Sequence, residues 1–386
     1  MKILISILAA LLSLNGMSQR YLMDEFPILD SIIGGTYGSS IDYQSNTQNL
    51  LFDFYEPLND TATKRPLIIY IHGGGFNSGS RTLFSVREIC RRMAKKGYAV
   101  ANLDYRLDPN FDIYNSATNR RVMTDAMHDA KQAIRFFKAN ATIYKIDTSL
   151  VFIGGESAGA ATSMMASFVD KQAEMSSYPM ANPNNPVGST VNSNVGNGVQ
   201  GTLCLCGLLL DTLAIELPTD PNILWTHGTN DNFIPISLAF NVVLRAANVG
   251  LPIVTKVYEG ATHCPWYFGL PNWTTYLDST ITDITNFLYP RVIATSGLIK
   301  IQGESNVSIY PNPFQNQINI VSTANVSEMR STIQIFNGLG QTVFNKTTHQ
   351  LNQGIFLNLE HLDEGCYFIL IENDGNRVIK KMIKSW

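Results

Sequence analysis

Short apolar runs alternate with stretches of helical spacing along most of the chain. Residues 65–75, "RPLIIYIHGGG", are mostly apolar up to a glycine loop, which predicts a buried strand. Residues 83–97 have apolar positions at helical spacing, basic residues in the last turn and Gly97 as a stop signal. The next pair repeats this order, with a strand predicted over 98–106 and a helix over 123–140. A strand followed by a helix is therefore the repeating unit.

The same alternation continues to about residue 300. Further strands are predicted over 149–155, 201–210, 222–228 and 253–260, and further helices over 158–166, 238–247 and 280–288. Strands that alternate with helices form a mainly parallel central sheet flanked by helices on both faces. Residues 178–198 interrupt the pattern with Asn, Pro, Ser and Gly, so we expect a surface loop there. The pattern predicts the α/β class.

Beyond residue 301 the helical spacing disappears and only strand patterns remain. They cover residues 307–321, 332–345, 354–362 and 365–384, with turn signals such as Asn337-Gly338 and Asp374-Gly375. We expect a small all-β sandwich domain over residues 299–386, with its own core and able to fold separately.

The first residues have the pattern of a secretory signal peptide. One early lysine precedes an apolar run over residues 3–14, and small residues follow it. Cleavage is expected between Ser18 and Gln19, so residues 1–18 are the signal peptide and residues 19–298 the α/β domain. A membrane anchor is the weaker interpretation, because a spanning helix needs about 20 apolar residues. No later segment is long and apolar enough to be a transmembrane segment.

Net charge and cysteine content bear on three features: nucleic-acid binding, zinc binding and disulfides. The 28 basic and 31 acidic residues give a net charge of -3, which argues against a nucleic-acid partner. Five cysteines are present, and none of their spacings resembles a zinc site. An exported chain can keep disulfides, and an odd number leaves at least one cysteine without a partner in the chain.

The stretch "FIGGESAGAA" (residues 152–161) contains G-x-S-x-G between a predicted strand and a predicted helix. One interpretation is packing, in which small residues let the helix lie close to the sheet. The other is a nucleophile, Ser157, on a strained turn where only small neighbours fit. The same helix N-terminus offers backbone N–H groups to an oxyanion. The strand–turn–helix context favours the nucleophile.

A serine nucleophile needs a base, and chain position favours His263 among the six histidines. His263 follows the last strand of the alternating region, where a loop can reach the end of the serine strand. His72 lies in the glycine loop, and His128 lies inside a predicted helix. His227 lies within an apolar strand and is interpreted as a core histidine that mainly affects stability.

Three carboxylates compete for the role of the acid that orients the base. Asp231 lies in a polar turn after a strand, between serine and histidine in chain order, where it can stay ionised. Asp211 also follows a strand end and is the main competitor, and Glu259 is the next.

The stretch "HGGGF" (residues 72–76) keeps three consecutive glycines, which are entropically costly to order. Glycines allow the backbone N–H groups to lie close to a substrate oxygen, which would explain why the loop keeps three of them.

With these motifs in order, residues 45–290 resemble an α/β-hydrolase carboxylesterase of the hormone-sensitive-lipase and type-B kind. The matching stretches are "YIHGGGFNSGS", "DYRL", "GGESAGAA", "HGTNDNFIP" and "GATH". The resemblance implies Ser157 as nucleophile, Asp231 as acid and His263 as base. It further implies an oxyanion hole of the N–H groups of Gly74, Gly75 and Ala158, with no metal or organic cofactor.

The resemblance also gives expectations for neighbouring residues. Asp104 and Arg106 of "DYRL" are expected to be structural, as a strand-end ion pair. The helical cap of many such lipases has no clear counterpart apart from the short N-terminal segment and the Asn/Pro-rich loop. Phe76 and Trp266 are candidate substrate-binding residues, and Tyr267 and Phe268 either line the pocket or belong to the core.

The cysteine next to the base raises a further expectation. Cys204 and Cys206 lie near the end of a central strand, whose end faces the same site in this fold. A disulfide from Cys264 to one of them, with Cys206 nearer the strand end, would hold the histidine loop in place.

The last part of the chain resembles the C-terminal sorting domain of type IX secretion in Bacteroidota-type bacteria. The stretches "YPNPFQNQINI", "IFNGLGQTVFN" and "KKMIK" carry this likeness. The resemblance implies the type IX secretion machinery as a partner and a secreted or cell-surface-attached protein. A carbohydrate-binding β module is the rival interpretation.

Together these features predict a secreted serine carboxylic-ester hydrolase that forms an acyl-enzyme. The expected substrates are short-chain, acetyl, feruloyl or polymer-borne esters. A serine peptidase of the prolyl-oligopeptidase type and a non-catalytic binding module on the hydrolase fold are the alternatives.

Overall fold

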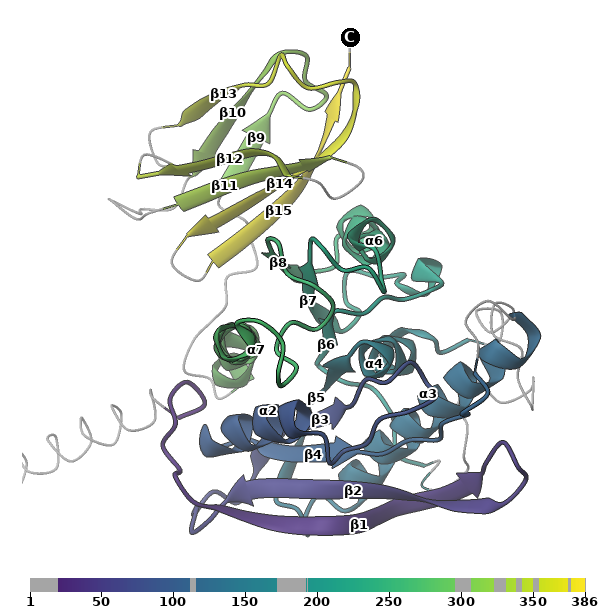
Figure 1. Ribbon diagram of the computed structural model, residues 1–386. Coiled ribbons are helices and arrows are strands. Elements are labelled where there is room, and N and C mark those ends of the chain that lie inside the picture. Colours follow the sequence, from purple (N-terminus) through teal and green to yellow (C-terminus); the bar gives the residue numbers. More distant parts are fainter. Residues whose placement is uncertain are drawn as a thin grey trace, which may run out of the picture.

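The computed structural model forms two regions, an α/β region and a C-terminal β region (Figure 1). It describes residues 20–111, 116–171, 192, 194–295, 307–322, 331–337, 342–349, 354–373 and 376–385. The expected signal peptide, its cleavage site and the expected domain boundary near residue 299 lie outside these residues, as does most of the Asn/Pro-rich loop. No helix among the described residues has the length and apolar character needed to cross a membrane.

A central sheet of eight strands has the order β1-β2-β4-β3-β5-β6-β7-β8. Besides β1 and β2, its strands are β3 (Arg65–Ile71), β4 (Ala99–Leu103), β5 (Ile146–Glu156), β6 (Gly201–Leu205), β7 (Asn222–Gly228) and β8 (Ile253–Tyr258). These six pair in parallel. β3, β4 and β6 are buried along their whole length, as expected for parallel strands covered on both faces. The predicted α/β architecture is therefore confirmed.

Two N-terminal strands extend this sheet in a way that the apolar pattern did not predict. β1 (Leu29–Ile41) and β2 (Thr47–Pro57) form an antiparallel hairpin, and β2 pairs antiparallel with β4. β1 is one of the two edge strands and is largely exposed, so it lacks the continuous apolar run that marks a buried strand. The N-terminal segment thus completes the sheet.

Helices cover both faces of the sheet. α3 (Ser116–Ala139), α4 (Ala158–Phe168) and α6 (Asn241–Val249) pack on one face, and α2 (Phe84–Lys95) and α7 (Trp273–Thr295) pack on the other. α5 (Ile236–Ala239) and the 3-10 turn η2 (Thr212–Ala214) are short connections beyond the strand ends. The predicted helix over 238–247 is therefore split between α5 and α6.

The expected ion pair between the two charged residues of "DYRL" does not form. Arg106 instead pairs with Asp129, with an Nη2 to Oδ1 distance of 2.7 Å, and with Asp125. Asp104 pairs with Arg81 and accepts its backbone N–H. Both residues therefore have structural partners: Arg106 pairs with two carboxylates of the helix over 116–139, and Asp104 pairs with Arg81 in the loop after β3.

The C-terminal region consists of two antiparallel sheets. One contains β9 (Val307–Tyr310), β10 (Gln317–Ser322) and β13 (Ile355–Asn358), and the other contains β11 (Ser331–Asn337), β12 (Thr342–Thr348), β14 (Gly365–Asn373) and β15 (Asn376–Lys384). Apolar side chains from both sheets form a single core. The predicted β sandwich is therefore confirmed.

The β sandwich also packs against the α/β region. The ring of Phe240, where α5 meets α6, lies 6.0 Å from the ring of Phe336 and 6.2 Å from that of Phe368. Both of these β-domain rings are buried. The contact covers apolar surface beside α6, so the two regions share a small hydrophobic interface.

Candidate active site

Ser157 lies on a tight turn between the end of β5 and the start of α4. Its φ of 54° and ψ of -118° are strained for a residue with a side chain. A Cβ on Gly155 or Gly159 would lie under 3.0 Å from the carbonyl oxygen of Ile71 in β3. The two glycines of the motif are therefore required because the turn lies against the neighbouring strand. This geometry favours a projected serine over simple packing.

Three residues from separate segments meet at this turn through hydrogen bonds. Nε2 of His263 lies 2.8 Å from Oγ of Ser157, and Nδ1 lies 2.6 Å from Oδ2 of Asp231. Because an ionised carboxylate only accepts hydrogen bonds, Nδ1 carries the ring proton and donates it to Asp231. In the neutral imidazole, Nε2 then accepts from the serine hydroxyl. This tautomer is the one that can take the serine proton.

Asp231 is buried but well supplied with donors. Its Oδ1 accepts from the backbone N–H groups of Phe233 and Ile234, at 2.9 and 2.8 Å. Burial opposes ionisation, but hydrogen bonds from His227, His263 and the N–H of Ile234 hold the pKa of Asp231 below its usual range. The carboxylate is therefore ionised at neutral pH.

The two competing acids have other partners. Asp211 caps η2 and accepts from the backbone N–H of Leu213 at 3.0 Å. Glu259 accepts from the hydroxyl of Thr229 at 3.3 Å. The structure thus brings Asp231, of the three candidates, to the imidazole of His263.

The glycine loop after β3 has the backbone expected of an anion-binding turn. Gly74 and Gly75 have φ values of 120° and 60°, which a residue with a side chain adopts only with strain. Ala158 is the first residue of α4, where N–H groups have no partner inside the helix. In the described part of the chain, the N–H groups of these three residues have no hydrogen-bond acceptor. They are available to an oxyanion.

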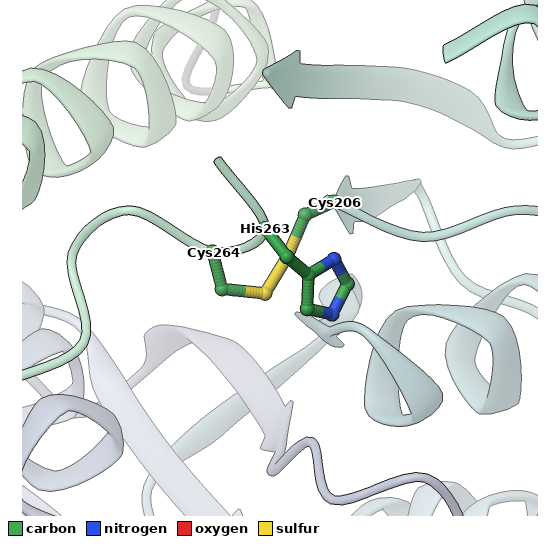
Figure 2. Close-up of side chains that lie close together, drawn as sticks. All are labelled: Cys206, His263 and Cys264. Carbon is green, nitrogen blue, oxygen red and sulfur yellow. A yellow bond between two sulfur atoms is a disulfide. The ribbon is translucent and has the colours of Figure 1, made fainter. Parts of the chain in front are cut away.

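A disulfide joins Cys264, next to the base, to Cys206 just beyond the end of β6, as expected (Figure 2). Cys206 and Cys264 belong to the same buried cluster, whereas Cys204 lies in the core of the opposite face. Alternation alone would put residues 204 and 206 on the same face, but Cys206 lies beyond the strand end, where its positive φ of 46° breaks the alternation and turns it to the histidine loop.

Donor atoms of Cys206, His263 and Cys264 all lie within 4.8 Å of one another. Thiolates and imidazole are good zinc ligands, but the two sulfur atoms are bonded to each other and offer no thiolate. Figure 2 shows the His263 ring beside the sulfur bridge. In the oxidised protein these two sulfur atoms form a bridge beside His263 and cannot serve as thiolate ligands.

The expectation that Trp266 contacts substrate is wrong in this structure. Trp266 is 0% exposed, and its indole N–H donates to Oε2 of Glu156 at 2.7 Å. The hydroxyl of Tyr70 donates to the same oxygen at 3.2 Å. Burial raises the pKa of Glu156, although these donors oppose the rise. Trp266 therefore links the loop that carries His263 to Glu156, the residue before Ser157.

Phe76 is likewise an interior residue. It is 6% exposed, and its ring packs on the rings of Tyr105 and Phe111. The aromatic side chain that does lie open beside the site is Phe233, which is 82% exposed with its ring 5.3 Å from that of His263. The sequence interpretation missed it, although it stands two residues after Asp231.

Two family models match separate parts of the chain. Residues 52–197 match the model described as BD-FAE, and residues 308–385 match the secretion system C-terminal sorting domain. The chain carries a BD-FAE α/β-hydrolase domain and a type IX sorting domain. The resemblances drawn from the motifs are confirmed at this level.

Curated relatives and solved structures agree with this assignment. The probable isoprenylcysteine alpha-carbonyl methylesterase ICME of Oryza sativa is 26% identical over 252 residues, which are 58% of this chain and 57% of that protein. Gut esterase 1 of Caenorhabditis elegans is 32% identical over 101 residues, 26% of this chain and 18% of that protein. The match therefore spans 57% of the length of the first relative and 18% of the length of the second.

Among solved structures, Thermogutta terrifontis esterase 2 phosphorylated by paraoxon superposes with a TM-score of 0.53. The match covers 72% of this chain and 98% of that chain at 19% identity. At 19% identity the likeness shows that the two proteins share a fold, and nothing more.

Proposed function

We propose that this protein is a secreted serine carboxylic-ester hydrolase that works through an acyl-enzyme. The observation that carries the proposal is the continuous hydrogen-bonded chain from Ser157 through His263 to Asp231 on a strained turn. The serine hydroxyl attacks the ester carbonyl while His263 takes its proton. His263 returns that proton to the leaving alcohol, and water then repeats the sequence on the acyl-enzyme.

The negative charge that develops on the carbonyl oxygen needs donors, and we assign this role to the N–H groups of Gly74, Gly75 and Ala158. The start of α4 adds the positive end of a helix dipole. Fixed donors of this kind contribute roughly 10²–10³ in turnover each in related chemistry. No metal or organic cofactor is required by these steps.

The proposed substrates are esters with short acyl groups, or acetyl and feruloyl esters carried by a polymer. The exposed ring of Phe233 on His263 supports this class, because it places the imidazole near the protein surface, where a polymer-borne ester can reach it. The methylesterase and esterase names of the curated relatives also support ester hydrolysis. The sorting domain supports release from the cell or attachment to its surface.

Ser157→Ala tests the proposal, with Ser167→Ala as the matched control on the same helix. Ser167 lies in α4 and donates to the carbonyl of Ser163 rather than to the site. We expect Ser157→Ala to lower turnover of a nitrophenyl acetate by several orders of magnitude at an unchanged melting temperature. Ser167→Ala is expected to stay within a few-fold of wild type.

Mass spectrometry after treatment with a fluorophosphonate should find the label on Ser157. Full activity in Ser157→Ala would refute the assignment. Cleavage of a prolyl peptide in preference to any ester would favour the peptidase alternative, and absence of both activities would favour a binding module.

A further inference from the structure

His227 lies against the acid of the proposed triad, although the sequence pattern marks it as a core residue. It is 1% exposed near the end of β7. Its Nε2 lies 3.2 Å from Oδ2 of Asp231 and 2.8 Å from the carbonyl oxygen of Ile234. Oδ2 is the same oxygen that lies 2.6 Å from Nδ1 of His263. Two imidazoles therefore share one carboxylate oxygen.

The proton on His227 can be placed by elimination. The carbonyl of Ile234 has no proton to give, so Nε2 must carry one and donate it. Nδ1 is buried without a hydrogen-bond partner among the described residues. The neutral ring is therefore the Nε2–H tautomer, whose single N–H donates to the carbonyl of Ile234 while Nε2 lies 3.2 Å from Oδ2 of Asp231. The ring of His227 also stacks on that of Trp225, with the ring centroids 5.3 Å apart and an interplanar angle of 11°.

The carboxylate of Asp231 is thereby held at both oxygens. Oδ1 accepts from the N–H groups of Phe233 and Ile234, and Oδ2 faces both His227 and His263. Without His227, Oδ2 keeps its contact with His263 but loses the one on the strand side, and the carbonyl of Ile234 loses its buried donor. Both changes would loosen the turn that carries Asp231.

We propose that His227 is a positioning residue, whose Nε2–H holds the carboxylate of Asp231 in the orientation that fixes the tautomer of His263. The expected effect of His227 on kcat rests on the proposed function, but its effect on the orientation of Asp231 does not. The orientation of the two imidazoles is a property of the folded protein and can be read without catalysis.

The kinetic test compares three variants in the full chain. His227→Phe keeps a ring for stacking but removes the donor, whereas the amide of His227→Gln reaches the position of Nε2 and restores a donor. Trp225→Phe is the matched control, because it perturbs the same strand while its own indole nitrogen has no partner in the described part of the protein. Melting temperatures and kcat and KM for a nitrophenyl acetate are measured for each.

We expect His227→Phe to lower kcat roughly ten- to a hundredfold at a nearly constant KM, as for a lost hydrogen bond to a charged group. His227→Gln is expected within about threefold of wild type, and Trp225→Phe to lose stability but little kcat. Equal kcat losses in His227→Phe and Trp225→Phe, or no recovery with Gln, would show that His227 acts only through stability.

A spectroscopic readout covers the case in which His227→Phe does not fold. ¹⁵N NMR of histidine-labelled wild type should show His227 as the Nε2–H tautomer and His263 as the Nδ1–H tautomer. In His227→Asn, whose amide is too short to reach Asp231, His263 should show a mixture of tautomers. An Nδ1–H tautomer for His227 in wild type overturns the inference, even if Ser157→Ala has already upheld the proposed function. If Ser157→Ala instead refutes that function, the tautomers still decide the inference.

Discussion

Removal of the disulfide beside the base should weaken both stability and catalysis. Cys206 and Cys264 are 58 residues apart in sequence, and the bond ties the end of β6 to the loop that carries His263. Both half-cystines have positive φ, 46° and 42°, which is unfavourable for residues with side chains. The bond and the surrounding core together hold this backbone conformation.

The magnitude follows from the loop that the bond closes. In the chain-entropy treatment, a closure of this length lowers the free energy of the folded state relative to the unfolded state by about 4 kcal/mol. For a domain of this size, roughly 2–4 °C of melting temperature corresponds to each kcal/mol. We therefore expect the double variant Cys206→Ser, Cys264→Ser to melt about 10 °C lower than wild type.

The activity should fall by more than the stability explains. At 20 °C the double variant remains folded, but the backbone next to His263 is free to leave its strained conformation. Because misplacement of a catalytic group by about 1 Å can cost roughly 10²-fold, we expect kcat for a nitrophenyl ester to fall by at least tenfold. Wild type treated with a phosphine reductant should approach the same values.

Cys204→Ala provides the control, because Cys204 is a buried free cysteine in β6, two residues before Cys206. It should retain the reductant-dependent drop in melting temperature, which the double variant should lack. A double variant that melts within 2 °C of wild type would refute the expected gain in stability. A double variant that keeps full kcat would refute the idea that the disulfide positions His263.

Three further changes test other parts of the structure. Asp231→Asn should lower ester turnover by roughly 10⁴ by leaving the base in the wrong tautomer, while Asp211→Asn stays near wild type; the reverse order would show that the acid is misassigned. Gly159→Ala should fail to fold or melt many degrees lower, because its Cβ would meet the backbone of β3, whereas Gly196→Ala, with open space around it, should be neutral in the same thermal assay. A chain ending at Ser296 uncovers the apolar surface beside α6, so we expect it to melt at a lower temperature than the full chain. Its kcat for a small ester should stay within about twofold of the full-length value. Loss of kcat would mean that the β domain contributes to the site.

The sequence predicts the inner sheet well because burial on both faces leaves a strong signal. Strands such as β3 and β6 are apolar at nearly every position, and the intervening helices keep their periodicity. β1 gives no such signal, because an edge strand with one solvated face has mostly exposed positions, and Ile32 and Ile33 among them are exposed. Its place became evident only from its pairing with β2.

The sequence could predict those site residues whose place depends only on strand ends and on their order in the chain. Ser157, Asp231 and His263 each follow a strand, and parallel strands bring their carboxyl ends to one edge of the sheet. Asp211 satisfies the same rule, so the sequence favours Asp231 only through its polar turn and does not exclude Asp211. Side-chain direction separates them, since Asp211 turns back to cap η2.

Burial within a strand does not say what a side chain faces, so the sequence could not show that His227 and Trp266 each lie against a carboxylate. His227 is as buried as an apolar core residue, yet the turn after β7 brings Asp231, four residues later, against its ring. Trp266 follows the base closely enough to suggest a pocket wall, but its indole donates inward to Glu156. Both residues contact a carboxylate beneath the exposed part of the site.

The disulfide and the sorting domain point to the same compartment by independent routes. A disulfide persists in oxidising surroundings and is reduced in the cytosol, and this one lies next to the proposed base rather than at the surface. The C-terminal domain belongs to a family that directs export. A protein whose histidine loop is fixed only after oxidation would gain its full activity outside the cytosol. The reductant-dependent loss of kcat described above would therefore also measure how far activity is coupled to export.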